Sequence, residues 1–170
     1  GDYRAERLLA KGRLPWNRGN GALDIDASGL QVGLPFASLQ ASLRGAVERL
    51  QFDATAQGDI GKLGLRGDAN KQGARWQGAL ASLQFAPELG GEWTLQQPAR
   101  WSWDGRNGAL SQACLRSANG GDLCANADWP RRGLDLQGDK LPLALLVPYL
   151  PERADGRPWA LNGDIDLTAQ

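Results

Sequence analysis

The sequence has no histidine and no methionine among its 170 residues, and it has only two cysteines. Without histidine, neither a Ser–His nor a Cys–His catalytic relay can form, and two cysteines are too few to hold a metal ion. A Gly-x-Ser-x-Gly motif and a glycine-rich phosphate loop opening a helix are also lacking. We therefore expect a protein that is not an enzyme and that carries no metal and no other cofactor.

An excess of charge of one sign is lacking as well. Nineteen basic and nineteen acidic residues cancel, and no run of lysine or arginine is long enough to neutralise many phosphates. This balance disfavours nucleic acid as a partner.

Long apolar runs are also missing. The longest, residues 141–150, contains Pro142 and Pro148 and falls well short of the roughly 20 residues that cross a bilayer. We expect that this segment does not itself span a membrane. The sequence starts at Gly1 without an initiator methionine or a signal-sequence pattern. We therefore also expect the chain to be a piece excised or processed from a longer protein.

What the sequence does have is period-two alternation of apolar and polar residues, punctuated by 23 glycines. The alternating runs are residues 23–27, 30–34, 39–43, 50–56, 63–65, 83–85, 93–95, 101–103, 123–129, 134–136 and 159–167. They predict an all-β protein of about a dozen short strands, with a further strand favoured over residues 3–11. Residues 143–150 lack alternation, follow a proline and predict one short helix. A sandwich, a barrel and an elongated curled sheet all fit this pattern.

The stretch 114–129 predicts a hairpin most sharply. If 118–120 form the loop, Leu115 lies opposite Leu123, and Cys114 lies directly opposite Cys124 on the other face. The spacing differs from a redox-active Cys-x-x-Cys pair. We predict a structural disulfide in an oxidising compartment, with two free thiols as the alternative.

Aspartates occur in two i, i+2 pairs, Asp24 with Asp26 and Asp164 with Asp166. Such a pair on one strand face could perform acid–base chemistry or bind calcium. The simpler interpretation places both pairs on the solvent face of strands whose other face is apolar, where like charges oppose aggregation.

Several motifs, taken in order, carry a resemblance to a known family. They are Trp16, 19–25, 75–78, 114–115, 123–124, Trp129, 141–143, 148–151 and Gly163. The chain resembles the TamB family, the inner-membrane-anchored component of the translocation and assembly module and a relative of AsmA-like proteins. The Cys-Leu…Leu-Cys hairpin with its following tryptophan and the Leu-Pro-Leu…Pro-Tyr-Leu-Pro segment are its most specific parts. The membrane helix and the C-terminal domain of the family are not found in these 170 residues.

The resemblance implies that residues 1–170 are a single segment of an elongated β-taco, a half-open, β-helix-like trough with an apolar concave wall. It further implies a periplasmic location, conduction of phospholipids between the inner and outer membranes, and assembly of outer-membrane proteins with a TamA-like barrel, contacted through parts outside this segment.

From the alternation and the resemblance together, we expect eleven apolar side chains to line the trough. They are Leu23, Ile25, Val32, Phe52, Leu65, Phe85, Leu95, Leu134, Leu136, Ile165 and Leu167. The seven tryptophans outnumber the three phenylalanines, and Trp93, Trp101 and Trp103 lie close together. They fit a wide core, an aromatic rim beside a lipid path, or a surface that stacks on carbohydrate.

Three other functions stay open. They are a structural β-solenoid or adhesin-like scaffold, a chaperone-like binder of outer-membrane protein strands, and a glycan-active β-helix that would use the aspartate pairs.

Overall fold

The computed structural model describes residues 5–13, 19–32, 34–151, 153 and 157–169 and shows one antiparallel sheet of twelve strands. The strands are β1 (Arg7–Arg13), β2 (Gly21–Val32), β3 (Leu34–Ala46), β4 (Arg49–Gly58), β5 (Gly61–Gln72), β6 (Arg75–Ala86), β7 (Trp93–Leu95), β8 (Ala99–Trp103), β9 (Gly108–Ser117), β10 (Asp122–Trp129), β11 (Gly133–Pro142) and β12 (Asp164–Ala169). A 3₁₀ helix, η1 (Leu143–Tyr149), connects β11 to β12. The all-β class, the number of strands and the single short helix predicted from the sequence are confirmed.

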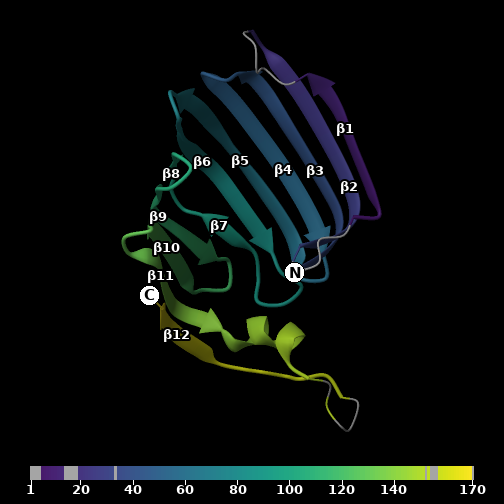
Figure 1. The fold of residues 1–170 in the computed structure, drawn as a ribbon. Coiled ribbons are helices and arrows are strands. Elements are labelled where there is room, and N and C mark those ends of the chain that lie inside the picture. Colours follow the sequence, from purple (N-terminus) through teal and green to yellow (C-terminus); the bar gives the residue numbers. More distant parts are fainter. Residues whose placement is uncertain (1–4, 14–18, 33, 152, 154–156, 170) are drawn as a thin grey trace.

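The strands follow one another across the sheet in chain order, with one exception. The short strands β7 and β8 both pair with β6 and with β9, so together they occupy the place of one long strand. In Figure 1 the long strands β1 to β6 form one wall, and β9 to β12 turn away from it on the other side of β7 and β8. The sheet is therefore curled into an open trough.

Three strand ranges expected from the sequence were wrong. The strand favoured over 3–11 is β1, which begins only at Arg7 and ends at Arg13, and residues 3 and 4 lie outside the described residues. Residues 30–34 were expected to be a strand of their own, but they contain the end of β2 and the start of β3, with Val32 paired to Leu34. Paired residues that lie two apart continue the period-two pattern through the turn, which hides the turn in the sequence. The final strand was expected over 159–167, whereas β12 begins only at Asp164.

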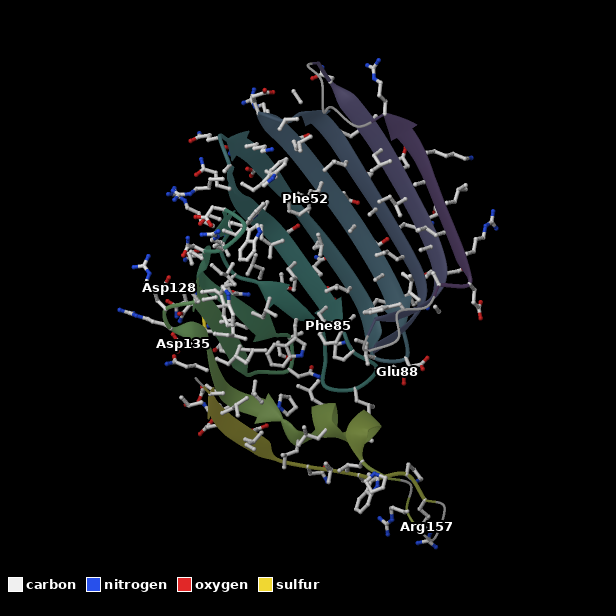
Figure 2. All side chains as sticks on the ribbon, viewed as in Figure 1. Phe52, Phe85, Glu88, Asp128, Asp135 and Arg157 are labelled. Atoms are coloured by element: carbon white, nitrogen blue, oxygen red, sulfur yellow. A yellow bond between two sulfur atoms is a disulfide. The ribbon has the colours of Figure 1, made fainter. Side chains whose placement is uncertain are left out.

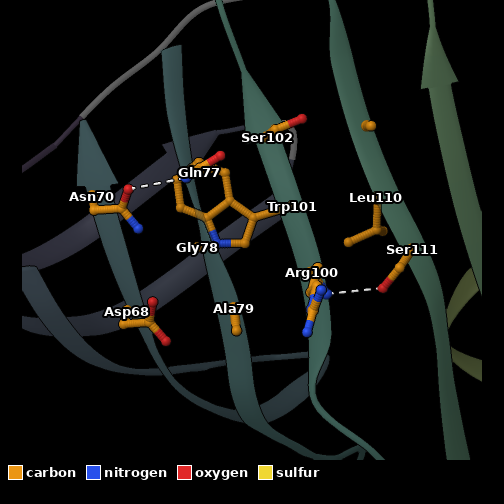
Figure 3. A pocket seen from close by; sticks show the side chains of 11 residues that line it. Asp68, Asn70, Gln77, Gly78, Ala79, Arg100, Trp101, Ser102, Leu110 and Ser111 are labelled. Atoms are coloured by element: carbon orange, nitrogen blue, oxygen red, sulfur yellow. Dashed lines mark hydrogen bonds between the residues drawn. The ribbon is translucent and has the colours of Figure 1, made fainter. Parts of the chain in front are cut away.

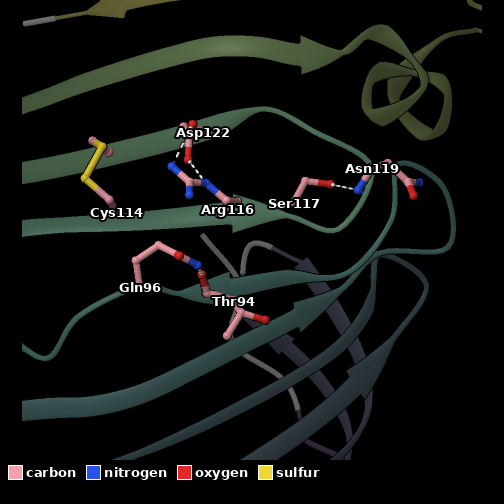
Figure 4. Close-up of polar contacts among 8 residues, drawn as sticks. Thr94, Gln96, Cys114, Arg116, Ser117, Asn119 and Asp122 are labelled. Carbon is pink, nitrogen blue, oxygen red and sulfur yellow. Dashed lines mark hydrogen bonds and ion pairs between the residues drawn. A yellow bond between two sulfur atoms is a disulfide. The ribbon is translucent and has the colours of Figure 1, made fainter.

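The hairpin of β9 and β10 has the predicted register. Leu115 lies opposite Leu123, Ala113 opposite Ala125, and Cys114 opposite Cys124. The two cysteines form a disulfide, visible in Figure 4 on the same face as the Arg116–Asp122 ion pair. The predicted disulfide and the turn at 118–120 are confirmed.

The curl leaves the molecule with much surface for its size. The accessible area is 11,836 Å², whereas a compact protein of 18.2 kDa has about 8,100 Å². Among the described residues no large apolar side chain is completely buried, although the small Ala99 is. The fold is consequently a curved single layer, in which one face of the sheet is only partly covered.

Candidate functional site

Residues that are paired across neighbouring antiparallel strands point to the same face, so the register shows which side chains share a surface. One such row runs without interruption from β2 to β7. It consists of Ala27, Leu39, Ala56, Leu63, Phe85 and Trp93. We call the face that contains this row the inner face. Figure 2 shows Phe52 and Phe85 on the inner side of the curve, whereas Asp128 and Asp135 project outward.

The register brings the predicted lining residues of the first wall together on the inner face. Leu23 and Phe52 both flank Leu43 of β3. Ile25 is paired with Ala41, Ala41 with Ala54, and Ala54 with Leu65. These side chains are half-buried, because the sheet curves around them without a second layer over them. They form a continuous apolar surface that remains in contact with solvent.

The second wall continues the same face. Leu95 of β7 lies opposite Leu115, Leu134 opposite Ala127, and Leu136 opposite Ala125. At the last strand, Ile165 pairs with Leu141, and Leu167 pairs with Gly138. Leu134, Ile165 and Leu167 keep 42% to 49% of their surface exposed. Of the eleven predicted lining residues, Val32 alone has a side chain outside the described part of the structure.

The helix η1 covers only one end of this surface. Leu145 packs against Gly90 in the loop after β6, close enough that a Cβ on that glycine would lie 2.6 Å from Leu145 Cδ2. Leu143 lies beside Gly163, where a Cβ would be 3.7 Å from its Cδ1. Leu146 stays 45% exposed. The helix thus closes one end and leaves the middle of the inner face uncovered.

The opposite, outer face is polar and carries ion pairs between neighbouring strands. Arg44 pairs with Asp24, and Arg66 Nε lies 3.0 Å from Asp53 Oδ2. A hollow of about 620 Å³ on this face, shown in Figure 3, is lined by both polar and apolar residues, among them Asp68, Asn70, Arg100, Trp101 and Leu110. This hollow is open, and two of its amides bond to each other, because Gln77 donates a hydrogen bond of 3.2 Å to Asn70. The apolar inner face is therefore the stronger candidate for binding a partner.

Comparison with known proteins decides the family. The model of the TamB N-terminal domain matches residues 1–170. The chain belongs to the TamB N-terminal domain family. No curated protein and no solved structure matches the sequence.

In this TamB-family chain the aspartate pairs lie on the outer face. Asp24 is in an ion pair with Arg44, and Asp166 accepts a hydrogen bond of 2.9 Å from the backbone N–H of Lys140. The described residues contain no group of three or more carboxylate, cysteine or histidine side chains that could hold a metal ion. In the same residues no helix is long and apolar enough to cross a membrane. The outer-face placement of the aspartates agrees with the simpler interpretation of these pairs.

The sequence reasoning missed a row of tryptophans at one edge of the inner face. The row crosses four strands. Trp76 of β6 lies opposite Trp103 of β8, and Gly108 of β9 lies between Trp103 and Trp129 of β10. The ring of Trp103 covers Gly108, with Cε3 at 2.9 Å from the position of a Cβ. Trp93, near Trp101 and Trp103 in sequence, is buried in β7 instead. Only the strand register reveals the row, because its members are separated by more than twenty residues along the chain.

Proposed function

We propose that the inner face binds the acyl chains of phospholipids and that this chain forms part of a periplasmic trough through which lipids pass between the inner and outer membranes. Within that function the protein is anchored in the inner membrane and supports outer-membrane biogenesis. Assembly of outer-membrane proteins with a TamA-like barrel would use parts outside these residues. No catalytic step belongs to this proposal.

One observation carries it: a continuous apolar face of the sheet, which in the described part of the structure is covered by η1 at one end and is otherwise without a second layer. The accessible area exceeds that of a compact protein of the same mass by about 3,700 Å². Part of this excess is the inner face, and a large exposed apolar surface is unusual unless another molecule covers it. An acyl chain gains about 0.8 kcal/mol for each methylene that it buries, so a chain lying on the inner face would be held without any specific polar contact.

The small residues between the large ones also favour a linear apolar ligand. Ala41 and Ala54 lie between Ile25 and Leu65, and Gly67 lies beneath the ring of Phe52. We infer a shallow channel above the small side chains from this order of large, small, small and large residues. A hydrocarbon chain fits such a channel, whereas a polar sugar would find few hydrogen-bond partners on this face.

The test compares an inner-face variant with an outer-face variant on neighbouring strands. Leu65→Asp places a carboxylate in the middle of the channel, and Gln84→Asp places one on the outer face of the adjacent β6. Each protein is exposed to a phospholipid with a photoreactive group at the end of its acyl chain, and crosslinking is measured by mass spectrometry. We expect Leu65→Asp to reduce crosslinking strongly and Gln84→Asp to leave it unchanged, with both proteins folded by circular dichroism.

Two results would contradict the proposal. If the wild-type protein never crosslinks to the acyl-chain probe at inner-face positions, the inner face does not bind acyl chains. An equal loss of crosslinking in both variants would show that added charge, and not its place on the inner face, interferes with lipid. Either result would favour a scaffold whose apolar face is covered by other protein.

A further inference from the structure

The tryptophan row ends at an edge of the sheet that is rich in cations. Lys71 of β5 pairs with Trp76, and its Nζ lies 5.6 Å from the centre of the Trp76 ring. The row therefore runs across β5, β6, β8, β9 and β10 as Lys71, Trp76, Trp103, Gly108 and Trp129. Trp103 is 43% exposed and Trp129 is 57% exposed. These indoles are the last large apolar groups of the inner face before the chain turns.

Four turns at this end of the strands form what we call the basic edge: residues 46–49, 71–75, 103–108 and 128–133, the last three of which include members of the row. They adjoin one another, since Val47 accepts a backbone hydrogen bond from Lys71, and the other three are joined through the tryptophan row. Together the turns contain six cations and three acids. The six cations are Arg49, Lys71, Arg75, Arg106, Arg131 and Arg132, and all six are exposed.

Two of the three acidic residues already interact with groups of their own turn. Asp104 accepts hydrogen bonds from the backbone N–H groups of Asn107 and Arg106, at 2.7 and 3.0 Å, and from the Asn107 side chain. These bonds lower its pKa to about 2, so it stays charged as a cap of its own turn. Asp128 lies 3.7 Å from Arg131. Among the described residues, Lys71, Arg106 and Arg132 have no ion-pair partner.

Three connections at the opposite ends of the strands have the reverse charge, whereas the connection from β11 to β12 contains Arg153 and Arg157. The connections 58–61, 86–93 and 117–122 contain Asp59, Glu88, Glu92 and Asp122 and no lysine or arginine. We call these three connections the acidic edge. Asp122 is in an ion pair with Arg116 of β9, whereas Asp59, Glu88 and Glu92 have no ion-pair partner among the described residues. The inner face is thus bounded by an excess of cations, with tryptophans, at one end of its strands and by these carboxylates at the other.

We propose that the basic edge binds the anionic phosphate headgroups of the lipids whose acyl chains lie on the inner face. This inference rests on the proposed function and adds an orientation to it, with headgroups at the basic edge and chain ends directed away from it. An indole suits the boundary between hydrocarbon and headgroup, because its ring is apolar and its N–H donates a hydrogen bond. Arginine pairs with phosphate through two parallel hydrogen bonds, and the acidic edge would repel the same group.

The tips of the turns favour a lipid held in the trough over a bilayer docked on the edge. A segment that inserts into a bilayer presents large apolar side chains at its tips. Here the tips are Gly73 and Ala74, the stretch 104–107, and Pro130 with its two following arginines, while the tryptophans point to the inner face. The largest apolar tip residue of the four turns is Val47.

The experiment uses two photoreactive phosphatidylglycerols, one with the reactive group in the headgroup and one with it at the end of an acyl chain. The protein carrying this chain is incubated with vesicles that contain either probe, irradiated and digested, and the labelled peptides are identified by mass spectrometry. We expect the headgroup probe to label the four turns of the basic edge and the acyl-chain probe to label inner-face positions. Glycerol phosphate, added as a competitor, should not reduce headgroup labelling at concentrations equal to the lipid.

A charge-reversal pair provides the matched variants. Arg75→Glu with Arg106→Glu alters the basic edge, and Lys62→Glu with Arg100→Glu makes the same change in net charge at exposed positions of the outer face. One cation near a lipid surface contributes about a fivefold change in binding, so the first pair should lower the preference for phosphatidylglycerol over phosphatidylcholine at least about tenfold. The second pair should leave the preference unchanged.

The failures are distinguishable. Three results would overturn the headgroup assignment: headgroup labelling spread equally over both edges, an unchanged lipid preference in the first pair of variants, or competition by glycerol phosphate. In each case, acyl-chain labelling of the inner face would still support the proposed function. Absence of acyl-chain labelling on the inner face would overturn the proposed function and this inference with it.

Discussion

Placing aspartate at Leu65 and at Leu50 separates an open trough from a closed core. Both leucines lie on the inner face, in the neighbouring strands β4 and β5, but their surroundings differ. Leu65 is half-buried between Ala54 and Leu83, whereas Leu50 is only 5% exposed and is flanked by Gly45 and Ala69. The same substitution therefore tests two different environments within one sheet.

The expected magnitudes follow from burial. A fully buried leucine contributes about 1.5 to 3 kcal/mol through the hydrophobic effect, so half-buried Leu65 contributes about 1 to 1.5 kcal/mol. A carboxylate at position 65 stays hydrated in an open trough, and Leu65→Asp should cost about that amount and little more. At position 50 the substitution loses the buried leucine and also buries an unpaired charge, which costs several kcal/mol more. A total of about 5 kcal/mol or more would be comparable with the whole stability of many domains.

Urea unfolding followed by circular dichroism measures both changes, and Leu65→Asn is the uncharged control. In an open trough Leu65→Asn and Leu65→Asp should have the same midpoint at neutral pH, because water solvates the carboxylate. A closed site would make the aspartate variant much less stable at pH 7 and would restore it at low pH, where the carboxyl is neutral. A pH-dependent loss of stability in Leu65→Asp would refute the open inner face. Unfolding of Leu65→Asp to the same extent as Leu50→Asp would refute it as well.

Three further predictions concern other parts of the molecule. Reduction of the Cys114–Cys124 disulfide, which closes a separation of 10 residues, should lower the free energy of unfolding by about 2 to 3 kcal/mol; maleimide labelling of both thiols without prior reduction would contradict the disulfide. Asp104 has its pKa lowered from 3.8 to about 2 by hydrogen bonds from Asn107 and Arg106, so it stabilises the fold above pH 4 and loses this contribution as the pH falls through about 2. The stability difference between wild type and Asp104→Asn should therefore shrink over that range, and a difference independent of pH would argue against it. The outer edges of β1 and β12 have no paired strand among the described residues, so the isolated chain should self-associate, and sedimentation that is independent of concentration would contradict this.

Much of the fold was predictable because each strand carries its own pattern. The alternation of Leu123, Ala125 and Ala127 identified the inner face of β10, and the Asn119-Gly120-Gly121 turn set its register with β9. These are local features, and the structure reproduces them. The boundary between β2 and β3 was hidden because Val32 and Leu34 continue the same alternation.

The arrangement between strands could not be obtained in this way. Alternation shows which residues share a face within one strand, but not which residue of the next strand lies opposite. The division of one strand position between β7 and β8 depends on pairing with both β6 and β9. The row formed by Trp76, Trp103 and Trp129 depends on three such registers. The open inner face likewise follows from the curl of the whole sheet.

The chain-order pairing of the strands makes this fold extendable. Since almost every strand contacts only its immediate predecessor and successor, a hairpin added or removed changes the length of the trough by two strand spacings, roughly 10 Å. Such a change preserves the direction of every following strand and keeps its apolar side chains on the same wall. A single added strand would instead reverse each later strand and exchange the basic and acidic ends beyond it. Evolution can therefore alter the span of such a sheet in steps of two strands while the polarity along each strand stays constant.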